Sequence, residues 1–204
     1  MNGIGVLALQ GDFELHIKML EKAGAKTVEV RTTEHLEEVE GLIIPGGEST
    51  TVSKLLRRYG LDRAISRRYK EGTLAVYGTC MGLILVSREI RDYPDIIRFG
   101  FLDVAVVRNA YGPQVESFED MVPVSLSNGD KGFDFRAVFI RAPQIVEVGR
   151  GVKVHARHSG KPILVSQGRC LGGSFHPELT EDTRVHDFFI ENFVKKTPGK
   201  GGKS

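Results

Sequence analysis

The N-terminal half of the chain alternates short apolar runs with segments of helical periodicity, and this alternation restricts the possible folds more than any other feature. Ile4 to Leu9 is an apolar run of strand length that ends at Gln10-Gly11-Asp12, and Phe13, Ile17 and Leu20 then recur at helical spacing. Further strand-like segments lie at 28–30, 42–44 and 74–77. Strands that alternate with helices pair in parallel, because each helix carries the chain back across the sheet. The pattern therefore predicts a parallel sheet covered by helices on both faces.

The helices between these runs have recognisable limits. Gly24 is expected to end the first helix, and Ser49 and Thr50 are expected to cap a second that continues towards Tyr69. Another helix is expected to begin near Met81.

After Phe99 the sequence changes character. Strand-like segments with little helix between them lie at 101–107, 122–126, 135–140, 152–156, 163–165 and 171–175. They predict an antiparallel or mixed extension of the same sheet, and a last helix is expected from Glu181 to Lys195. The predicted fold class is α/β, a three-layer sandwich with a mostly parallel central sheet and an antiparallel extension.

A single domain accounts for the chain. Its 204 residues suit one hydrophobic core, and neither a linker nor an internal repeat divides the sequence. We expect the domain to span residues 1–195. The lysine- and glycine-rich segment 196–204 is expected to be a disordered tail, because it has too few apolar side chains to bury.

Composition excludes several classes of protein. A formal net charge of +2 is too small to indicate a nucleic-acid partner. No apolar run reaches the ~18 residues of a membrane span, and the start of the chain lacks the basic region of a signal peptide. With only two cysteines, Cys80 and Cys170, a disulfide framework is not expected. We expect a cytoplasmic protein without a membrane partner.

Three glycine-containing turns follow the predicted parallel strands. They are Gln10-Gly11, Pro45-Gly46-Gly47 and Gly78-Thr79-Cys80-Met81-Gly82. In open parallel sheets, ligands bind beyond the carboxyl ends of the strands. The chemistry of this chain is therefore expected where these turns converge.

The third turn has the form of a nucleophile elbow. Gly78-Thr79-Cys80-Met81-Gly82 follows an apolar strand and precedes a helix, and its two glycines permit a sharp turn that exposes the central side chain. A cysteine at a helix N-terminus is favoured as thiolate by the unpaired backbone N–H groups. The alternative is that Cys80 is only a small buried hydrophobe.

His176-Pro177-Glu178 supplies the partners that a thiolate nucleophile needs. His176 could act as the base, and Glu178, two residues on along an extended segment, could orient its ring. The alternative is a surface histidine beside a glutamate that caps a helix. The two motifs together favour a Cys-His-Glu relay.

The remaining histidines and Cys170 carry weaker signals. His155 and His158 have metal-ligand spacing, but no carboxylate or cysteine nearby completes a site, so no metal is expected. His16 and His186 are interpreted as polar helix positions. Cys170 has no base beside it and is interpreted as structural.

Acyl chemistry also needs donors for a developing oxyanion. The turn at Gly46 and Gly47 can present backbone N–H groups, and the N–H of Met81, just after the nucleophile, is the natural second donor. The alternative for the two glycines is a plain tight turn.

These motifs resemble the class I glutamine amidotransferases, and in particular the glutaminase subunit of the two-component pyridoxal 5′-phosphate synthase. The resemblance extends from about residue 3 to 193. The segments that carry it are Leu7 to Gly11, Leu42 to Thr51, Gly78-Thr79-Cys80, Arg108-Asn109-Ala110-Tyr111-Gly112, Ser117-Phe118-Glu119, Phe139 to Pro143 and Ser174 to Thr180.

The resemblance implies roles for matching residues, with Cys80 as nucleophile and His176 and Glu178 completing the relay. The residues implied to bind glutamine are Gly47, Glu48, Ser49, Arg108, Ile140 and Arg141. Arginine suits the α-carboxylate of glutamine, and we infer that Glu48 holds its α-ammonium. Structural or surface ion pairs are the alternative for the two arginines.

The implied reaction converts L-glutamine and water into L-glutamate and ammonia, without a metal or cofactor. By resemblance, the ammonia passes to a synthase subunit within a hetero-oligomer that makes pyridoxal 5′-phosphate. One alternative is the glutaminase of another amidotransferase such as imidazole glycerol phosphate synthase, and a second is a non-catalytic regulatory partner.

An ammonia donor that works without its acceptor wastes glutamine, so we expect the isolated chain to be nearly idle. Gln10-Gly11-Asp12 could sense the synthase through the Gly46-Gly47 turn. A basic helix at 57–68 is another candidate contact, with a solvated face as its alternative. Its cations are Arg57, Arg58, Arg63, Arg67 and Arg68.

Overall fold

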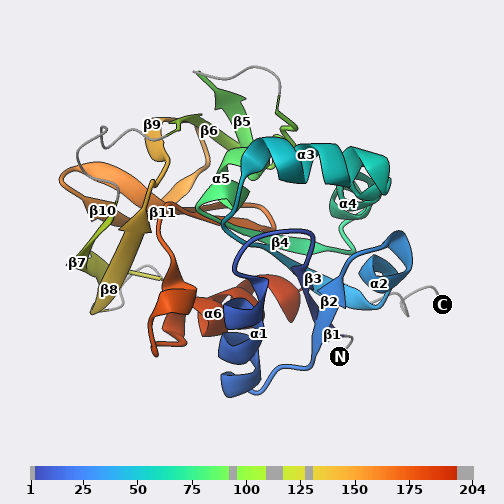
Figure 1. Cartoon of the computed structure of the whole chain (residues 1–204). Helices are drawn as coiled ribbons and strands as arrows, with labels where there is room; N and C mark the ends of the chain where they lie inside the picture. The colour runs from blue at the N-terminus through green and yellow to red at the C-terminus, as the bar shows by residue number, and fades with distance from the viewer. Residues whose placement is uncertain (1–2, 92–95, 109–116, 127–130, 197–204) are drawn as a thin grey trace.

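A nine-stranded sheet forms the centre of the computed structural model, which describes residues 3–91, 96–108, 117–126 and 131–196. The strand order is β2-β1-β3-β4-β12-β11-β10-β7-β8 (Figure 1). The strands from β2 to β12 pair in parallel, and those from β12 to β8 pair antiparallel. The parallel strands are β1 (Gly3–Leu7), β2 (Thr27–Val30), β3 (Val39–Ile44), β4 (Ala75–Thr79) and β12 (Cys170–Gly173). The others are β7 (Ser117–Val124), β8 (Phe133–Ile140), β10 (Lys153–His158) and β11 (Lys161–Gln167).

A second, three-stranded sheet corrects part of the sequence prediction. It consists of β5 (Ser87–Ile90), β6 (Leu102–Val107) and β9 (Gln144–Val148). The segment 101–107 was expected in the extension of the main sheet, but β6 pairs with β5 in parallel and with β9 antiparallel. Alternating apolar residues predict a strand but do not specify its partner.

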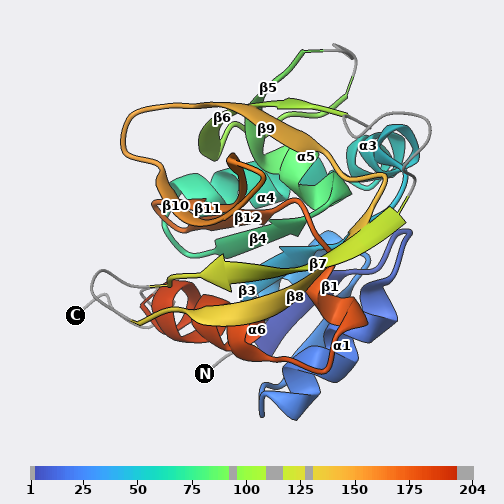
Figure 2. The same ribbon diagram turned by 90° about the vertical axis from the view of Figure 1, so that its left-hand side faces the viewer.

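Helices cover both faces of the main sheet, because its buried strands are apolar on both sides. In β3, Leu42 and Ile44 point into one core cluster and Ile43 into the other, as the two-residue period of a strand requires. Figure 2 shows the resulting layers, which confirm the predicted fold class. The first face carries α2 (Thr33–Glu37), α3 (Ser49–Arg58), α4 (Leu61–Lys70) and α5 (Met81–Val86). The second carries α1 (Phe13–Lys22), α6 (Arg184–Phe189) and its π-helical continuation Ile190–Val194.

Two helices differ from the prediction. The helix expected from residue 49 towards 69 is broken into α3 and α4, because Gly60 adopts a left-handed conformation with φ 69°. The N-cap of α3 is Glu48, whose carboxylate accepts from the N–H groups of Thr50 at 3.0 Å and Thr51 at 2.7 Å. The last helix begins at Arg184, three residues later than expected.

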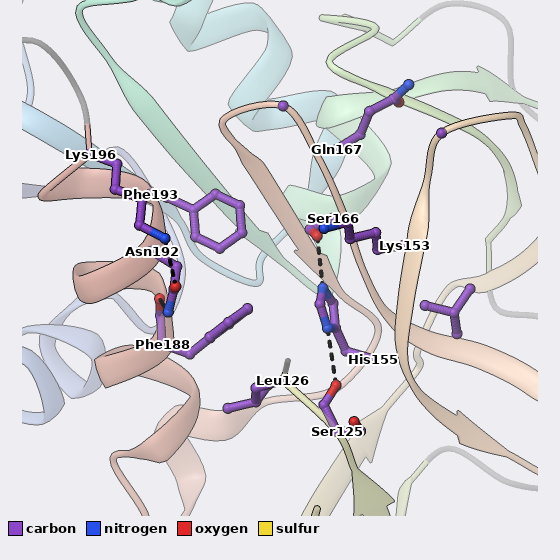
Figure 3. Close-up of a pocket in the computed structure, with 13 residues that line it drawn as sticks. Ser125, Leu126, Lys153, His155, Ser166, Gln167, Phe188, Asn192, Phe193 and Lys196 are labelled. Carbon is purple, nitrogen blue, oxygen red and sulfur yellow. Dashed lines mark hydrogen bonds between the residues drawn. The ribbon is translucent and has the colours of Figure 1, made fainter. Parts of the chain in front are cut away.

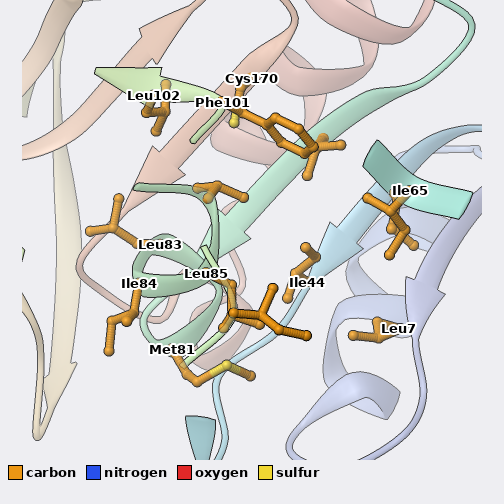
Figure 4. Packing of buried hydrophobic residues seen from close by; sticks show 14 of the residues in the cluster. Leu7, Ile44, Ile65, Met81, Leu83, Ile84, Leu85, Phe101, Leu102 and Cys170 are labelled. Carbon is orange, nitrogen blue, oxygen red and sulfur yellow. The ribbon is translucent and has the colours of Figure 1, made fainter. Parts of the chain in front are cut away.

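Helix α5 is held by the core on all sides. All six of its residues are buried, and Figure 4 shows Leu83 and Leu85 packed among Ile44, Leu102 and other apolar side chains from both sheets. Full burial of one leucine is worth about 1.5–3 kcal/mol. This packing sets the position of the turn that precedes α5, where Cys80 lies.

No helix among the described residues is long and apolar enough to cross a membrane. Two predictions lie outside the described residues, namely the family segment at 109–112 and the tail at 197–204.

We predict that Leu83→Ala lowers the free energy of unfolding by about 2–5 kcal/mol, because it leaves a cavity beside α5. For a chain of this size, each kcal/mol lowers the melting temperature by about 2–4 °C. Tyr59→Ala is the control, since 47% of Tyr59 is exposed. Thermal unfolding followed by circular dichroism measures both, and equal melting temperatures would contradict the proposed role of this packing.

Candidate active site

The turn after β4 places the buried Cys80 at the wall of a hollow, because two glycines let backbone segments pass where side chains could not. A Cβ on Gly82 would overlap the carbonyl oxygen of Ile44, and one on Gly78 would overlap the carbonyl of Gly82. Cys80 has φ 50° and ψ −108°, a conformation that costs a non-glycine residue about 1–3 kcal/mol. Its N–H donates to the carbonyl of Gly173 at 2.8 Å. Strand β12 therefore helps to hold the strained turn in place.

His176 and Glu178 lie just beyond the carboxyl end of β12. Nδ1 of His176 is 2.7 Å from Oε1 of Glu178, and both side chains are buried. The sequence predicted that an extended segment would bring them together, but a 3₁₀ turn spanning Pro177–Leu179 does so. Proline suits the first position of such a turn, because its fixed φ is already helical.

The charges of this pair depend on each other and on Cys80. Burial lowers the pKa of His176, but Cys80 and Glu178 raise it, and the result is about 10. Burial raises the pKa of Glu178, but His16 and His176 lower it to about 2. Near neutral pH these pKa values favour an imidazolium beside the sulfur and a carboxylate behind it. An imidazolium stabilises a thiolate and can protonate a leaving group.

Cys80 and His176 line one hollow of about 310 Å³. The turns after β1, β3 and β4 converge on it, as expected for the carboxyl ends of parallel strands. Its lining is Gln10, Gly11, Asp12, Gly47, Glu48, Ser49, Cys80, Met81, Ile84, Arg108, Ile140, Arg141 and His176. All the residues implied to bind glutamine are among them, and their roles remain predictions. Gly46, the remaining residue of the expected oxyanion site, packs against the ring of His176.

The loop after β1 supports the turn that was expected to supply oxyanion donors. Oε1 of Gln10 accepts from the N–H of Glu48 at 2.7 Å. A Cβ on Gly11 would overlap the carbonyl oxygen of Gly46, so the two backbones touch. A change in the loop after β1 would therefore move the Gly46-Gly47 turn.

The remaining charged groups of the hollow include Glu48 and Arg141. Burial raises the pKa of Glu48, but the N–H groups and hydroxyls of Thr50 and Thr51 lower it to about 2. Glu48 thus caps α3 and still presents an anion to the hollow. Arg141 is exposed and has φ 43°, a strained backbone for a residue with a side chain. The carbonyl oxygen of the preceding Ile140 lies 3.7 Å from the sulfur of Cys80.

A buried histidine pair, which was not predicted from the sequence, lies behind the site. His16 and His186, interpreted as polar helix positions, are completely buried, with Nδ1 of His16 3.0 Å from Nε2 of His186. Nε2 of His16 lies 3.1 Å from Oγ1 of Thr79 and 3.2 Å from Oε2 of Glu178. The signal was available in α1, where His16 shares a face with the buried Met19 and Leu20 at helical spacing.

A second hollow, of about 400 Å³, lies beside β10, β11 and the C-terminal helix (Figure 3). His155 is buried there, with Nε2 2.7 Å from Oγ of Ser166 and Nδ1 3.1 Å from the carbonyl oxygen of Ser125. His158 instead approaches Asp120 at 3.1 Å. The two histidines point to different neighbours, because residues three apart lie on opposite faces of a strand. They form no common metal site.

Among the described residues, the cluster whose geometry could hold a metal ion is Asp12, His176 and Glu178, with ligand atoms within 4.8 Å of one another. The imidazole of His176 and the carboxylate of Glu178 are already hydrogen-bonded to each other, and we assign no ion to the cluster. Cys170 is completely buried, and burial raises the pKa of its thiol. Burial in the core agrees with the structural role predicted for it.

Known proteins resemble the chain over nearly its full length. The model of the SNO glutamine amidotransferase family matches residues 6–195. A pyridoxal 5′-phosphate synthase subunit PdxT from a strain of Thermus thermophilus is 53% identical over 189 residues, which cover 92% of this chain and 96% of the relative. The PdxT of Thermotoga neapolitana is 47% identical and covers 92% of this chain and 97% of its own.

Solved structures agree with these matches. A crystal structure described as a glutamine amidotransferase superposes with a TM-score of 0.86 at 51% identity, covering 92% of this chain and 97% of that one. The structure of PurLQS from Thermotoga maritima shares the fold, with a TM-score of 0.69 at 18% identity over 93% of this chain and 98% of that one. With the family model covering nearly the whole chain and relatives about half identical, this protein belongs to the SNO glutamine amidotransferase family.

Proposed function

We propose that the chain hydrolyses L-glutamine at Cys80 and delivers the ammonia to a synthase subunit that makes pyridoxal 5′-phosphate. The observation that carries the proposal is the placement of Cys80 and His176 in one hollow, with Glu178 bonded to the far side of the imidazole. The curated relatives described above bear the name of a pyridoxal 5′-phosphate synthase subunit. Their name favours pyridoxal 5′-phosphate synthase as the enzyme that receives the ammonia, over the acceptors used by other amidotransferases such as imidazole glycerol phosphate synthase.

The reaction proceeds in two stages. The thiolate of Cys80 attacks the side-chain amide carbon of glutamine, and N–H groups of the Gly46-Gly47 turn and Met81 stabilise the oxyanion. His176 donates its proton to the amide nitrogen, ammonia leaves and a γ-glutamyl thioester remains. The imidazole then takes a proton from water, whose oxygen attacks the thioester and releases glutamate and the thiolate. Glu178 stays ionised throughout and holds the ring of His176.

The charged residues of the hollow match the ends of the substrate. Arg108 and Arg141 would bind the α-carboxylate, and Glu48 the α-ammonium. Glu48 can do so while it caps α3, because the N–H groups of Thr50 and Thr51 favour its ionised form, and the anion still attracts an ammonium group. Ser49 and Ile140 complete the wall around the substrate.

We also propose that residues 1–195 form the working unit, that the segment 196–204 takes no part in catalysis, and that the protein is cytoplasmic. The family match ends at residue 195, which supports this boundary. Two unpaired cysteines suit a reducing compartment.

Part of the basic segment at 57–68 has a structural role. Arg68 is buried and donates to the carbonyl oxygens of Leu36 and Thr73, so it is unsuited to contact a partner. Arg67 pairs with Glu37 on the surface at 2.9 Å. The remaining exposed arginines stay candidates for contact with the synthase.

Cys80→Ala is expected to abolish glutamate release, and Cys170→Ala to leave it nearly intact, because Cys170 lies in the core away from the hollow. Glutamate release by the chain together with its synthase measures both variants, with circular dichroism to show that each is folded. If the Cys80 variant retained a substantial part of the activity, the proposed nucleophile would be wrong.

Arg108→Ala and Arg141→Ala are each expected to raise KM for glutamine by about 10- to 150-fold, since each loses a charge-assisted hydrogen bond of roughly 1.5–3 kcal/mol. Arg136→Ala is the matched control, because Arg136 pairs with Glu119 on the surface outside the hollow. Steady-state kinetics test the three variants. If Arg108→Ala and Arg141→Ala both left the kinetics unchanged, the two arginines would instead be assigned to structural ion pairs.

The isolated chain is expected to be nearly idle and to be activated by its synthase. Removal of one oxyanion donor slows catalysis by about 10²–10³-fold, and the loop at Gln10 and Gly11 touches the turn that would supply such a donor. Steady-state glutamate release by the chain alone and by the mixture measures the effect. Equal rates with and without the synthase would show that the glutaminase is active on its own and would contradict the proposed activation.

A further inference from the structure

The carboxylate of Glu178 has one oxygen that the catalytic relay does not use. Oε1 approaches His176, whereas Oε2 is buried and has no hydrogen bond within the described part of the chain. A buried, unsatisfied carboxylate oxygen is costly, because the protein interior solvates charge poorly. The nitrogen that faces Oε2, at 3.2 Å, is Nε2 of His16.

The neighbours of His16 determine which of its nitrogens carries the proton. Glu178 is an anion that only accepts hydrogen bonds, so a proton on Nε2 is favoured there and a lone pair would be repelled. Nδ1 then accepts from Nε2–H of His186, at 3.0 Å. The opposite tautomer would leave a buried N–H on Nδ1 of His186, an atom without a hydrogen-bond partner in the described chain. Both contacts therefore select the same tautomer.

Both histidines are neutral near neutral pH. Burial is the largest effect on the pKa of His16 and lowers it. Glu178 raises this pKa and His176 lowers it, and the net shift is downward. Burial, together with His16, lowers the pKa of His186 to about 3. The titratable groups around His16 are Glu178 and His176 beyond β12, His186 on α6 and Asp12 before α1, and Tyr77 on β4 interacts with Glu178. A neutral imidazole whose N–H faces the carboxylate stabilises its charge without competing with His176 for a proton.

We propose that His16 is a positioning residue, whose Nε2–H keeps the Glu178 carboxylate ionised and turned towards Nδ1 of His176. His186 favours that tautomer, and the hydroxyl of Thr79, which can accept from Nε2–H at 3.1 Å, fixes the position of the ring. The contacts behind Cys80 thus continue from His176 and Glu178 to His16 on α1 and His186 on α6. These two helices lie side by side in Figures 1 and 2. The inference rests on the proposed function, because it concerns how that reaction is supported.

His16→Leu removes the N–H that faces Glu178, and His16→Gln retains an amide N–H at a similar distance along the side chain. The matched control is His155→Leu, which removes another buried, hydrogen-bonded histidine in the separate hollow of Figure 3. Each variant is assayed for glutamate release in complex with the synthase, and its melting temperature is recorded. His16→Asn, whose amide is too short to reach, replaces the leucine variant if the latter does not fold.

The leucine variant is expected to lose about 10- to 150-fold in kcat with little change in KM, because substrate contacts are intact. Without His16 the pKa of Glu178 rises, so the acid limb of the kcat profile moves to higher pH. His16→Gln should recover most of the rate, and His155→Leu should lower only the melting temperature. If kcat and its acid limb stay unchanged in His16→Leu while Cys80→Ala is inactive, the positioning role is wrong and the proposed nucleophile stands. Activity in Cys80→Ala would instead contradict the proposed function itself.

Discussion

The contact between Gly82 and the carbonyl oxygen of Ile44 is the constraint on which the site depends. It lets the first turn of α5 lie directly against β3, where any side chain would overlap the backbone. Because α5 is then enclosed by the core, the strained φ of Cys80 is maintained by packing energy from many apolar side chains. The position of the nucleophile is therefore fixed by packing, and many core contacts together offset the strain energy of Cys80.

The second physical requirement is a buried carboxylate at the end of β12. Glu178 is almost fully buried, so its charge is tolerable only if other groups compensate for lost water. His176 supplies one such group at 2.7 Å, and His16 faces the other oxygen at 3.2 Å. Elements distant in sequence, α1 and the turn after β12, must come together before this charge is stabilised. The electrostatics of the site and the packing of the helices on this face thus depend on each other.

Several predictions failed where local sequence patterns did not include the competing interaction. Residues 101–107 form a strand as expected, yet β6 joins the smaller sheet, because strand pairing is decided by neighbours. Gly60 divides a helix whose apolar periodicity continues on both sides of it. Glu48 was considered only as a ligand for substrate, but its position before α3 also makes it the N-cap.

The alternating α/β architecture, the elbow at Cys80 and the family could all be predicted from the sequence, because periodicity, glycine spacing and short motifs are local properties of the chain. The turns that would meet could also be predicted, since the carboxyl ends of parallel strands share one edge. The bend of the His-Pro-Glu segment and the direction of the second carboxylate oxygen of Glu178 depend instead on how distant elements pack together. Only the tertiary structure places His16 and His186 behind the site, because the burial of a polar side chain depends on elements that pack against it from elsewhere in the chain.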